Sequence, residues 1–133
     1  MIPYIESRYR ALTGRDDRAI IGLSMGGGQA LSIGLNHLEL FSYVGGFSSG
    51  LGSAADFSKS YASLIVHPET ANTTVRLLWV GCGTEDGAFA ASKGFSDFLN
   101  KNRIKHTFRE TSGAHTWMVW RRYMHEISAL LFQ

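Results

Sequence analysis

The sequence contains one cysteine, two prolines and no long apolar run, and these shortages exclude several classes of protein. A single cysteine, Cys82, excludes an internal disulfide framework. No stretch approaches the roughly 18 consecutive apolar residues of a membrane-spanning helix, which argues against a membrane partner. The opening residues MIPYIESRYR lack the basic and then apolar segments of a secretion signal. The cellular compartment is left open.

The chain also has little excess of positive over negative charge. The chain has 13 Lys and Arg against 11 Asp and Glu, a formal net charge of +2. The most basic stretch, NKNRIKHTFR at 100–109, is typical of a helix end running into a strand, so no nucleic acid partner is expected. The 133 residues are 44% hydrophobic and 18% charged, which is ordinary for one globular domain with a real core. We predict a single domain over 1–133.

Short apolar runs alternate with stretches of helical periodicity. Strands are predicted at 18–23, 41–48, 75–83 and 105–111. Helices are predicted at 3–12, 26–38, 87–102 and 115–133. The intervening part is less regular, with a loop at 49–53, helical residues within 57–66 and a connector at 67–74. This alternation predicts an α/β fold, with a mainly parallel sheet of about four strands and helices on both faces.

The segment GLSMG, residues 22–26, fits the pattern Gly-x-Ser-x-Gly between a predicted strand and a predicted helix. In a nucleophile elbow the serine occupies a strained apex, and the glycines are small because strand and helix nearly touch. The helix N-terminus would direct backbone N–H groups at an oxyanion beside Ser24, with the Met25 N–H as the first donor. Alternatively, Ser24 is an N-cap and the glycines form a tight turn.

A nucleophilic serine needs a base and a third group that orients the base. In the elbow fold they follow in the order Ser, acid, His, each after a strand. Asp86 follows the third predicted strand and His115 the fourth, so both are predicted to meet Ser24 at one edge of the sheet. Other readings stay open: Asp86 and His115 are helix caps, or Glu85 is the acid.

The remaining histidines and the cysteine compete poorly for a catalytic role. The remaining histidines are His37, His67, His106 and His125. They are predicted to lie at a helix end, in a connector, on a strand and inside the last helix, respectively, and these positions favour structural or solvated roles. Cys82, at the end of a buried strand, is expected to be a small core residue.

Four segments together resemble a known family: IPYIESRYR, AIIGLSMGGGQAL, LLWVGCGTEDG and SGAHTWMVWRRYMHEISALLF. They are similar to the esterase D and feruloyl esterase branch of the α/β-hydrolases, which includes enterochelin esterases and carbohydrate esterases. The resemblance covers nearly the whole chain and implies a three-layer αβα fold. By position it implies Ser24 as nucleophile, Asp86 as acid and His115 as base. It also implies Met25 as an oxyanion donor and Trp117 as an aromatic residue near the substrate.

The resemblance implies that the chain corresponds to the C-terminal half of such an enzyme, with a truncated sheet. Strand 18–23, central in the family, would then lie at an exposed apolar edge, which is a template for pairing with another chain. We therefore predict a homo-oligomer, a two-fold dimer through this strand. The loop that supplies the second oxyanion donor in the family would also be missing, which predicts weakened activity.

The function predicted from these observations is a serine carboxylesterase that works through an acyl-enzyme and needs no metal or organic cofactor. The resemblance implies a small substrate, such as an acetyl or feruloyl ester on plant polysaccharide. Two alternatives remain. The chain is a catalytically impaired fragment or interaction module that retains the triad residues, or it is an acyltransferase that passes the acyl group to a sugar hydroxyl.

Overall fold

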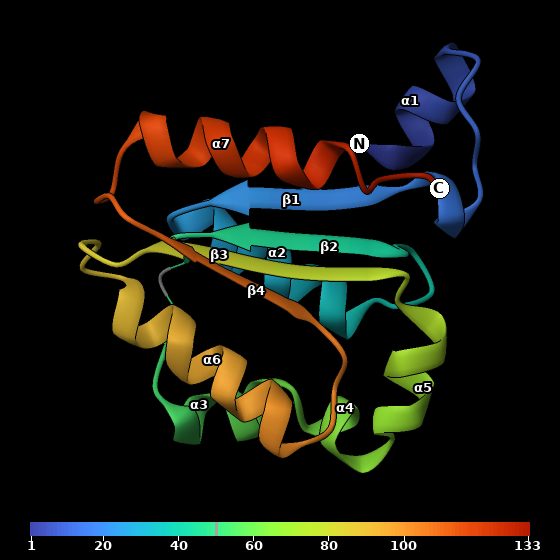
Figure 1. Ribbon diagram of the computed structural model, residues 1–133. Coiled ribbons are helices and arrows are strands. Elements are labelled where there is room, and N and C mark those ends of the chain that lie inside the picture. Colours follow the sequence, from blue (N-terminus) through green and yellow to red (C-terminus); the bar gives the residue numbers. More distant parts are fainter. Residues whose placement is uncertain (50) are drawn as a thin grey trace.

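The computed structural model describes residues 1–49 and 51–133, and its centre is a 4-stranded parallel sheet (Figure 1). Gly50, which falls in the loop predicted at 49–53, lies outside the described residues. The strands lie side by side in chain order: β1 (Ala19–Leu23), β2 (Tyr43–Phe47), β3 (Leu77–Gly83) and β4 (Thr107–Thr111). All three strand pairings are parallel, so the predicted sheet is confirmed.

Helices cover both faces of this sheet. In the described part of the chain the helices are α1 (Ile2–Arg8), α2 (Met25–Asn36), α3 (Ala54–Ser60), α4 (Ala62–Val66), α5 (Pro68–Thr74), α6 (Phe89–Lys101) and α7 (Trp117–Ser128), with a short 3-10 turn η1 at Arg15–Asp17. Helix α7 packs on one face, whereas α2 and α6 pack on the other together with α3 (Figure 1). The three-layer α/β fold is confirmed.

The central strands β2 and β3 have buried residues along nearly their whole length, as continuous apolar runs predict for strands covered on both faces. Alternate side chains enter two cores. Val44 and Val80 enter the larger core under α2 and α6, whereas Phe47 and Trp79 enter the smaller core under α7. Tyr123 closes the smaller core, with its ring 5.2 Å from that of Trp79 in an edge-to-face arrangement. A single helix therefore covers the second face through aromatic packing.

Three helix predictions differ from the structure. The first helix ends at Arg8 instead of residue 12, because α1 has no buried residue and nothing in it stabilises further turns. The predicted connector at 67–74 contains α5, which begins with Pro68 in the first turn, where its missing N–H is harmless. The last helix ends at Ser128, and its buried face is centred on Tyr123.

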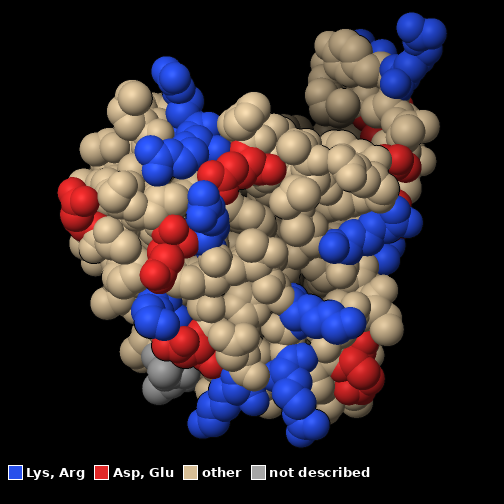
Figure 2. Space-filling view, in the orientation of Figure 1, with Lys and Arg blue, Asp and Glu red and all other residues tan. Residues whose placement is uncertain are grey.

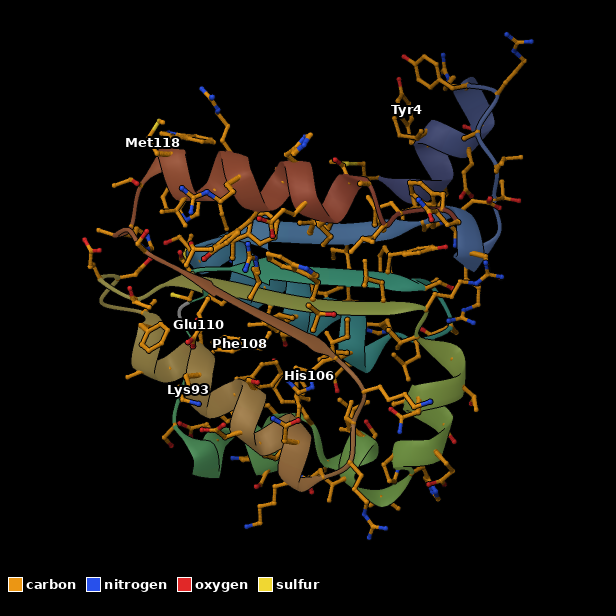
Figure 3. All side chains as sticks on the ribbon, in the orientation of Figure 1. Tyr4, Lys93, His106, Phe108, Glu110 and Met118 are labelled. Atoms are coloured by element: carbon orange, nitrogen blue, oxygen red, sulfur yellow. The ribbon has the colours of Figure 1, made fainter. Side chains whose placement is uncertain are left out.

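The two lateral edges of the sheet differ in character. Strand β1 is apolar and half-buried at one edge, and Ile33 on α2 and Met124 on α7 are 46% and 49% exposed. Strand β4 at the other edge carries charged residues, including the exposed Glu110, while Phe108 packs against the larger core (Figure 3). The predicted position of β1 at an edge is confirmed. Pairing of a second chain there stays a prediction.

The surface shows little segregation of charge. On the face drawn in Figure 2, Lys and Arg side chains are scattered among Asp and Glu side chains, with uncharged surface between them. Within the described residues, no helix combines the length and the hydropathy needed to cross a membrane.

Candidate active site

Ser24 stands at the apex of a sharp turn between β1 and α2. Its backbone has φ 54° and ψ −125°, a conformation that non-glycine residues rarely adopt. Its N–H donates to the Phe47 carbonyl at 2.8 Å, which anchors the turn to the end of β2. Ser24 occupies the N-cap position of α2, as the alternative reading expects, but its side chain makes no capping bond to the helix. The hydroxyl is left for another partner.

The close approach of strand and helix at this turn depends on two glycines. A Cβ on Gly22 would lie 2.1 Å from the Gly26 carbonyl oxygen, so no side chain fits at position 22. A Cβ on Gly26 would meet nothing within 4 Å, so the expectation that both flanking glycines must be small is not met at position 26. The second tight position is Gly27, where a Cβ would lie 2.6 Å from Ser49 Oγ and 3.0 Å from the Phe47 carbonyl oxygen.

Asp86 lies in the turn between β3 and α6 and is only 5% exposed. Its Oδ1 accepts a hydrogen bond from the Ala88 N–H at 2.8 Å. Burial raises the pKa of this carboxyl, but hydrogen bonds from Ala88, Ser48 and His115 outweigh burial, and the pKa lies below its usual 3.8. Asp86 is therefore an ionised carboxylate at neutral pH, held from several sides.

His115 joins the two other predicted residues. Its Nδ1 lies 3.0 Å from each carboxylate oxygen of Asp86, and its Nε2 lies 2.9 Å from Ser24 Oγ. The imidazole side is partly open to solvent, while the carboxylate side is closed. The structure thus brings the side chains of Ser24, Asp86 and His115 into one hydrogen-bonded row, although they are 91 residues apart at the extremes.

The alternative assignments can be compared with these contacts. Glu85 is exposed, and its Oε1 accepts the Gly113 N–H at 3.2 Å, so it holds the loop before His115 instead of facing the imidazole. The N-cap position of α7 belongs to Thr116, and His115 is not the cap. Asp86 does accept a hydrogen bond from the Ala88 N–H just before α6. It therefore supports the start of that helix, as the capping alternative expects, and also contacts His115.

Two residues near this row were missed by sequence reasoning. Ser48 follows β2 at the same edge of the sheet, is fully buried, and its hydroxyl contributes to lowering the pKa of Asp86. Trp120 on α7 donates its indole N–H to Ser48 Oγ at 2.9 Å, and its ring stands edge-on to the His115 ring at 4.8 Å. The available signal was that Ser48 directly follows a predicted strand, as do the other residues of the site.

The two peripheral predictions have different surroundings. Met25 contributes the first backbone N–H of α2, beside Ser24, and helix N-termini leave such groups without an intrahelical partner. Trp117 is 69% exposed, and its ring contacts Trp120 at 5.5 Å. Trp120 thus lies between Trp117 and His115 and contacts both rings.

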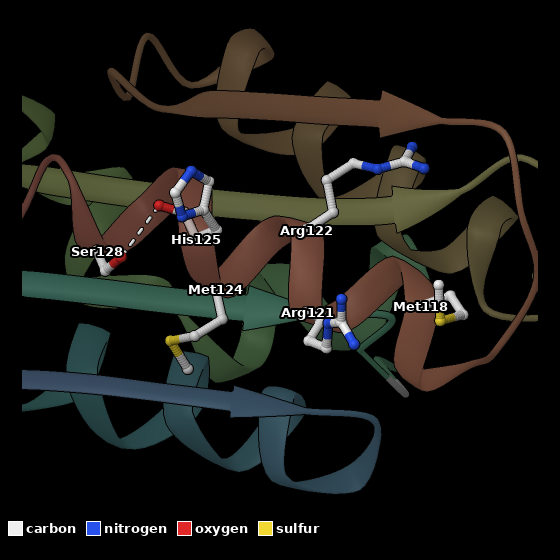
Figure 4. Close-up of a pocket in the computed structure, with 6 residues that line it drawn as sticks. All are labelled: Met118, Arg121, Arg122, Met124, His125 and Ser128. Carbon is white, nitrogen blue, oxygen red and sulfur yellow. Dashed lines mark hydrogen bonds between the residues drawn. The ribbon is translucent and has the colours of Figure 1, made fainter.

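A separate hollow lies on the outward face of α7 (Figure 4). It is lined by Met118, Arg121, Arg122, Met124, His125 and Ser128. None of these residues belongs to the row of Ser24, Asp86 and His115. In the part of the chain that the structure describes, no group of three or more His, Cys, Asp or Glu residues is arranged to hold a metal ion.

Comparison with known proteins identifies the family. A family model described as "Putative esterase" matches residues 1–131. The chain belongs to the Esterase family.

Individual proteins of known name resemble the chain at modest identity. The endo-1,4-beta-xylanase/feruloyl esterase of Xylanibacter ruminicola is 25% identical over 133 residues, which covers 100% of this chain and 17% of that protein. The acetyl esterase of Caldicellulosiruptor saccharolyticus is 24% identical over 139 residues, which covers 83% of this chain and 52% of that protein.

A solved ferulic acid esterase from Anaeromyces mucronatus, in complex with ferulic acid, has a TM-score of 0.80 and 26% identity, and the match covers 98% of this chain and 50% of that one. The chain therefore spans about half or less of the length of these three proteins. The resemblance drawn from the sequence is confirmed as that of a partial, esterase-like α/β-hydrolase domain.

Proposed function

We propose that this member of the Esterase family is a serine carboxylic-ester hydrolase, with Ser24 as nucleophile, His115 as base and Asp86 as the acid that orients the base. One observation carries the proposal: the His115 imidazole spans the other two side chains, 2.9 Å from Ser24 Oγ and 3.0 Å from the Asp86 carboxylate. Nucleophile, base and orienting group in hydrogen-bonding reach of one another are the arrangement that activates a serine hydroxyl.

In acylation, Ser24 Oγ attacks the ester carbonyl carbon while His115 Nε2 takes the hydroxyl proton. The Asp86 carboxylate keeps the other imidazole proton on Nδ1 and stabilises the imidazolium that forms. The tetrahedral intermediate then breaks its bond to the alcohol oxygen. His115 returns the proton to that oxygen, and the acyl group stays on Ser24.

In deacylation, water replaces the alcohol. His115 takes a proton from the water, and the resulting hydroxide adds to the acyl carbon. Collapse of the second tetrahedral intermediate releases the carboxylic acid, and His115 returns the proton to Ser24 Oγ. The partly exposed imidazole gives water access to Nε2.

The negative charge of each tetrahedral intermediate develops on the former carbonyl oxygen. The Met25 N–H and the positive end of the α2 dipole lie beside Ser24 and would stabilise this charge. We assign one oxyanion donor to this chain. Removal of one oxyanion-hole donor slows a serine hydrolase by about 10²- to 10³-fold.

For the substrate we propose acetyl or feruloyl esters of plant polysaccharide. The support is that two relatives, which match 100% and 83% of this chain, are named an endo-1,4-beta-xylanase/feruloyl esterase and an acetyl esterase. The exposed Trp117 would offer its aromatic face to the acyl group or the sugar beside the site.

Replacement of Ser24 by alanine tests the nucleophile. With a p-nitrophenyl acetate substrate, Ser24→Ala should reduce kcat by about 10⁴-fold or more, because no other group replaces the hydroxyl. The matched control is Ser42→Ala, a fully buried serine that precedes β2 at the opposite end of the sheet. The control should keep the wild-type rate per folded molecule.

Covalent labelling provides a second readout that does not depend on the choice of ester. A fluorophosphonate should label the wild-type protein once per chain at Ser24, and Ser24→Ala should remain unlabelled. Hydrolysis at the wild-type rate by Ser24→Ala would contradict the proposal. Folded wild-type protein that takes up no label would instead support the alternative of an impaired fragment or interaction module.

A further inference from the structure

Trp120 touches the proposed catalytic row in two places. Its ring stands at 89° to the His115 ring with centroids 4.8 Å apart, and its Nε1–H donates to Ser48 Oγ at 2.9 Å. Trp120 is 9% exposed and Ser48 is fully buried. The Trp120 side chain therefore contacts the His115 imidazole directly and also hydrogen-bonds the Ser48 hydroxyl, which neighbours Asp86.

The backbone holds Ser48 in an unusual conformation at this point. Its φ of 48° lies in the left-handed region, which costs a non-glycine residue about 1–2 kcal/mol. Its N–H donates to the Gly81 carbonyl at 2.7 Å, one residue beyond the end of β2. The side chain is thus aimed by the continuation of the sheet, and the strain persists because packing around it is tight.

The donors and acceptors around Ser48 determine where its hydroxyl proton points. A serine hydroxyl has one proton to donate and two lone pairs that accept. The indole of Trp120 can only donate, so the Ser48 oxygen accepts from it and its own proton remains for another partner. Two neighbouring groups can take this proton, the Cys82 thiol and the Asp86 carboxylate, and the carboxylate, whose pKa the Ser48 hydroxyl helps to lower, is the stronger acceptor.

We propose that Ser48 is a positioning residue for the His115–Asp86 pair: Trp120 holds the Ser48 hydroxyl so that its proton is donated to the Asp86 carboxylate, which keeps the carboxylate aligned with His115 Nδ1. This inference rests on the proposed function and adds to it a buried group from β2. The carboxylate is then held on separate sides, by the Ala88 N–H, by Ser48 and by the imidazole.

Two other ionisable groups face Asp86 among the described residues. His115 is its hydrogen-bond partner, and the buried thiol of Cys82 approaches it from β3. Burial raises the pKa of Cys82 above its usual 9.0, so the thiol stays neutral over the pH range of an esterase assay. A change of the acidic limb of a pH profile therefore reports the Asp86–His115 pair.

Ser48→Gly removes the hydroxyl without adding backbone strain, since glycine adopts the left-handed conformation readily. We expect kcat for p-nitrophenyl acetate to fall about 10- to 100-fold with KM unchanged, because a displaced carboxylate misaligns the base and Ser48 does not reach the substrate. The acidic limb of the kcat/KM profile should move to higher pH, because the pair binds a proton more tightly once the carboxylate has lost a donor.

Two further variants separate positioning from packing. Ser49→Ala is the matched control: Ser49 is also fully buried and adjacent in sequence, but its hydroxyl has no hydrogen-bond partner. It should keep the wild-type kcat and pH profile. Trp120→Phe removes the N–H while keeping a ring beside His115, and it should shift the pH profile in the same direction as Ser48→Gly by a smaller amount.

A proton NMR titration of the His115 ring, assigned by comparison with His115→Gln, gives a readout that needs no activity. In Ser48→Gly the midpoint of this titration should move to higher pH, and in Ser49→Ala it should not. Wild-type rate, pH profile and titration in folded Ser48→Gly would overturn the inference. Hydrolysis that survives Ser24→Ala would overturn the proposed function instead, and the titration would still decide the role of Ser48.

Discussion

The two ends of the sheet carry two polar networks of opposite character. At the carboxyl rim, where the strands end, the side chains of the site bond mainly to one another. At the amino rim, where the strands begin, Arg15 instead donates to backbone carbonyls, among them that of Leu38 at 3.0 Å. Arg76 pairs with Asp16 at 2.7 Å on the same rim.

The difference shows what each network contributes. The amino rim satisfies carbonyl groups that loops leave unpaired and joins segments distant in sequence, which stabilises the fold. The carboxyl rim places an imidazole nitrogen that is partly open to solvent beside a serine hydroxyl, an arrangement that stability alone does not require. In open parallel sheets, ligands bind beyond the carboxyl ends of the strands, in agreement with this division.

The largest effect that tests this comparison is expected from the two aspartates. Asp86→Asn should lower kcat by about 10³- to 10⁴-fold, because an amide no longer stabilises the imidazolium and favours the wrong tautomer. Asp16→Asn, the matched change at the amino rim, should leave kcat unchanged. Rates with p-nitrophenyl acetate on protein of verified fold measure both. Equal losses in the two variants would remove the functional distinction between the rims.

The next effect concerns the oxyanion donor at the carboxyl rim. If a second copy pairs with β1, as the apolar edge predicts, the partner lies next to Ser24 and is placed to supply the second oxyanion donor. Activity per chain should then rise with protein concentration, by up to about 10²- to 10³-fold. Light scattering over the same concentrations should show a dimer. A stable monomer at micromolar concentration, with constant specific activity, would contradict the predicted pairing.

The smallest effect is expected at the amino rim, on stability alone. Arg15→Ala should lower the free energy of unfolding by about 1–3 kcal/mol, because it leaves partly buried carbonyl groups without a donor. Activity per folded molecule should stay at the wild-type value. Arg121→Ala, on the exposed face of α7, serves as the control and should change stability by less than about 0.5 kcal/mol. Urea denaturation measures both variants.

The sequence was most informative where one residue pattern has one physical outcome. Apolar runs such as 75–83 predict buried parallel strands because both faces of these strands are covered, and the structure has β3 there. The positions of Ser24, Asp86 and His115 directly after strands predict that they share an edge, and their side chains do meet.

Prediction was poorer where tertiary packing decides. The polar segment 67–74 has no apolar stripe, and it is helical because Ala71 packs into the larger core. The roles of Ser48 and Trp120 depend on a contact between residues 72 positions apart, which no local pattern indicates. The steric need for glycine at position 27, instead of 26, likewise depends on Ser49 from another strand end.

The loop between β4 and α7 is held by two hydrogen bonds with Glu85, one at the backbone carbonyl and one at the backbone N–H of Gly113. The Glu85 N–H donates to the Gly113 carbonyl at 3.1 Å, and the Glu85 carboxylate accepts the Gly113 N–H. From this fastening the chain has two residues in which to bring His115 across to Ser24. An extra residue inserted here would add up to about 3.5 Å of chain and carry the imidazole out of reach. Surface loops usually accept changes of length, but evolution has little freedom to lengthen this one.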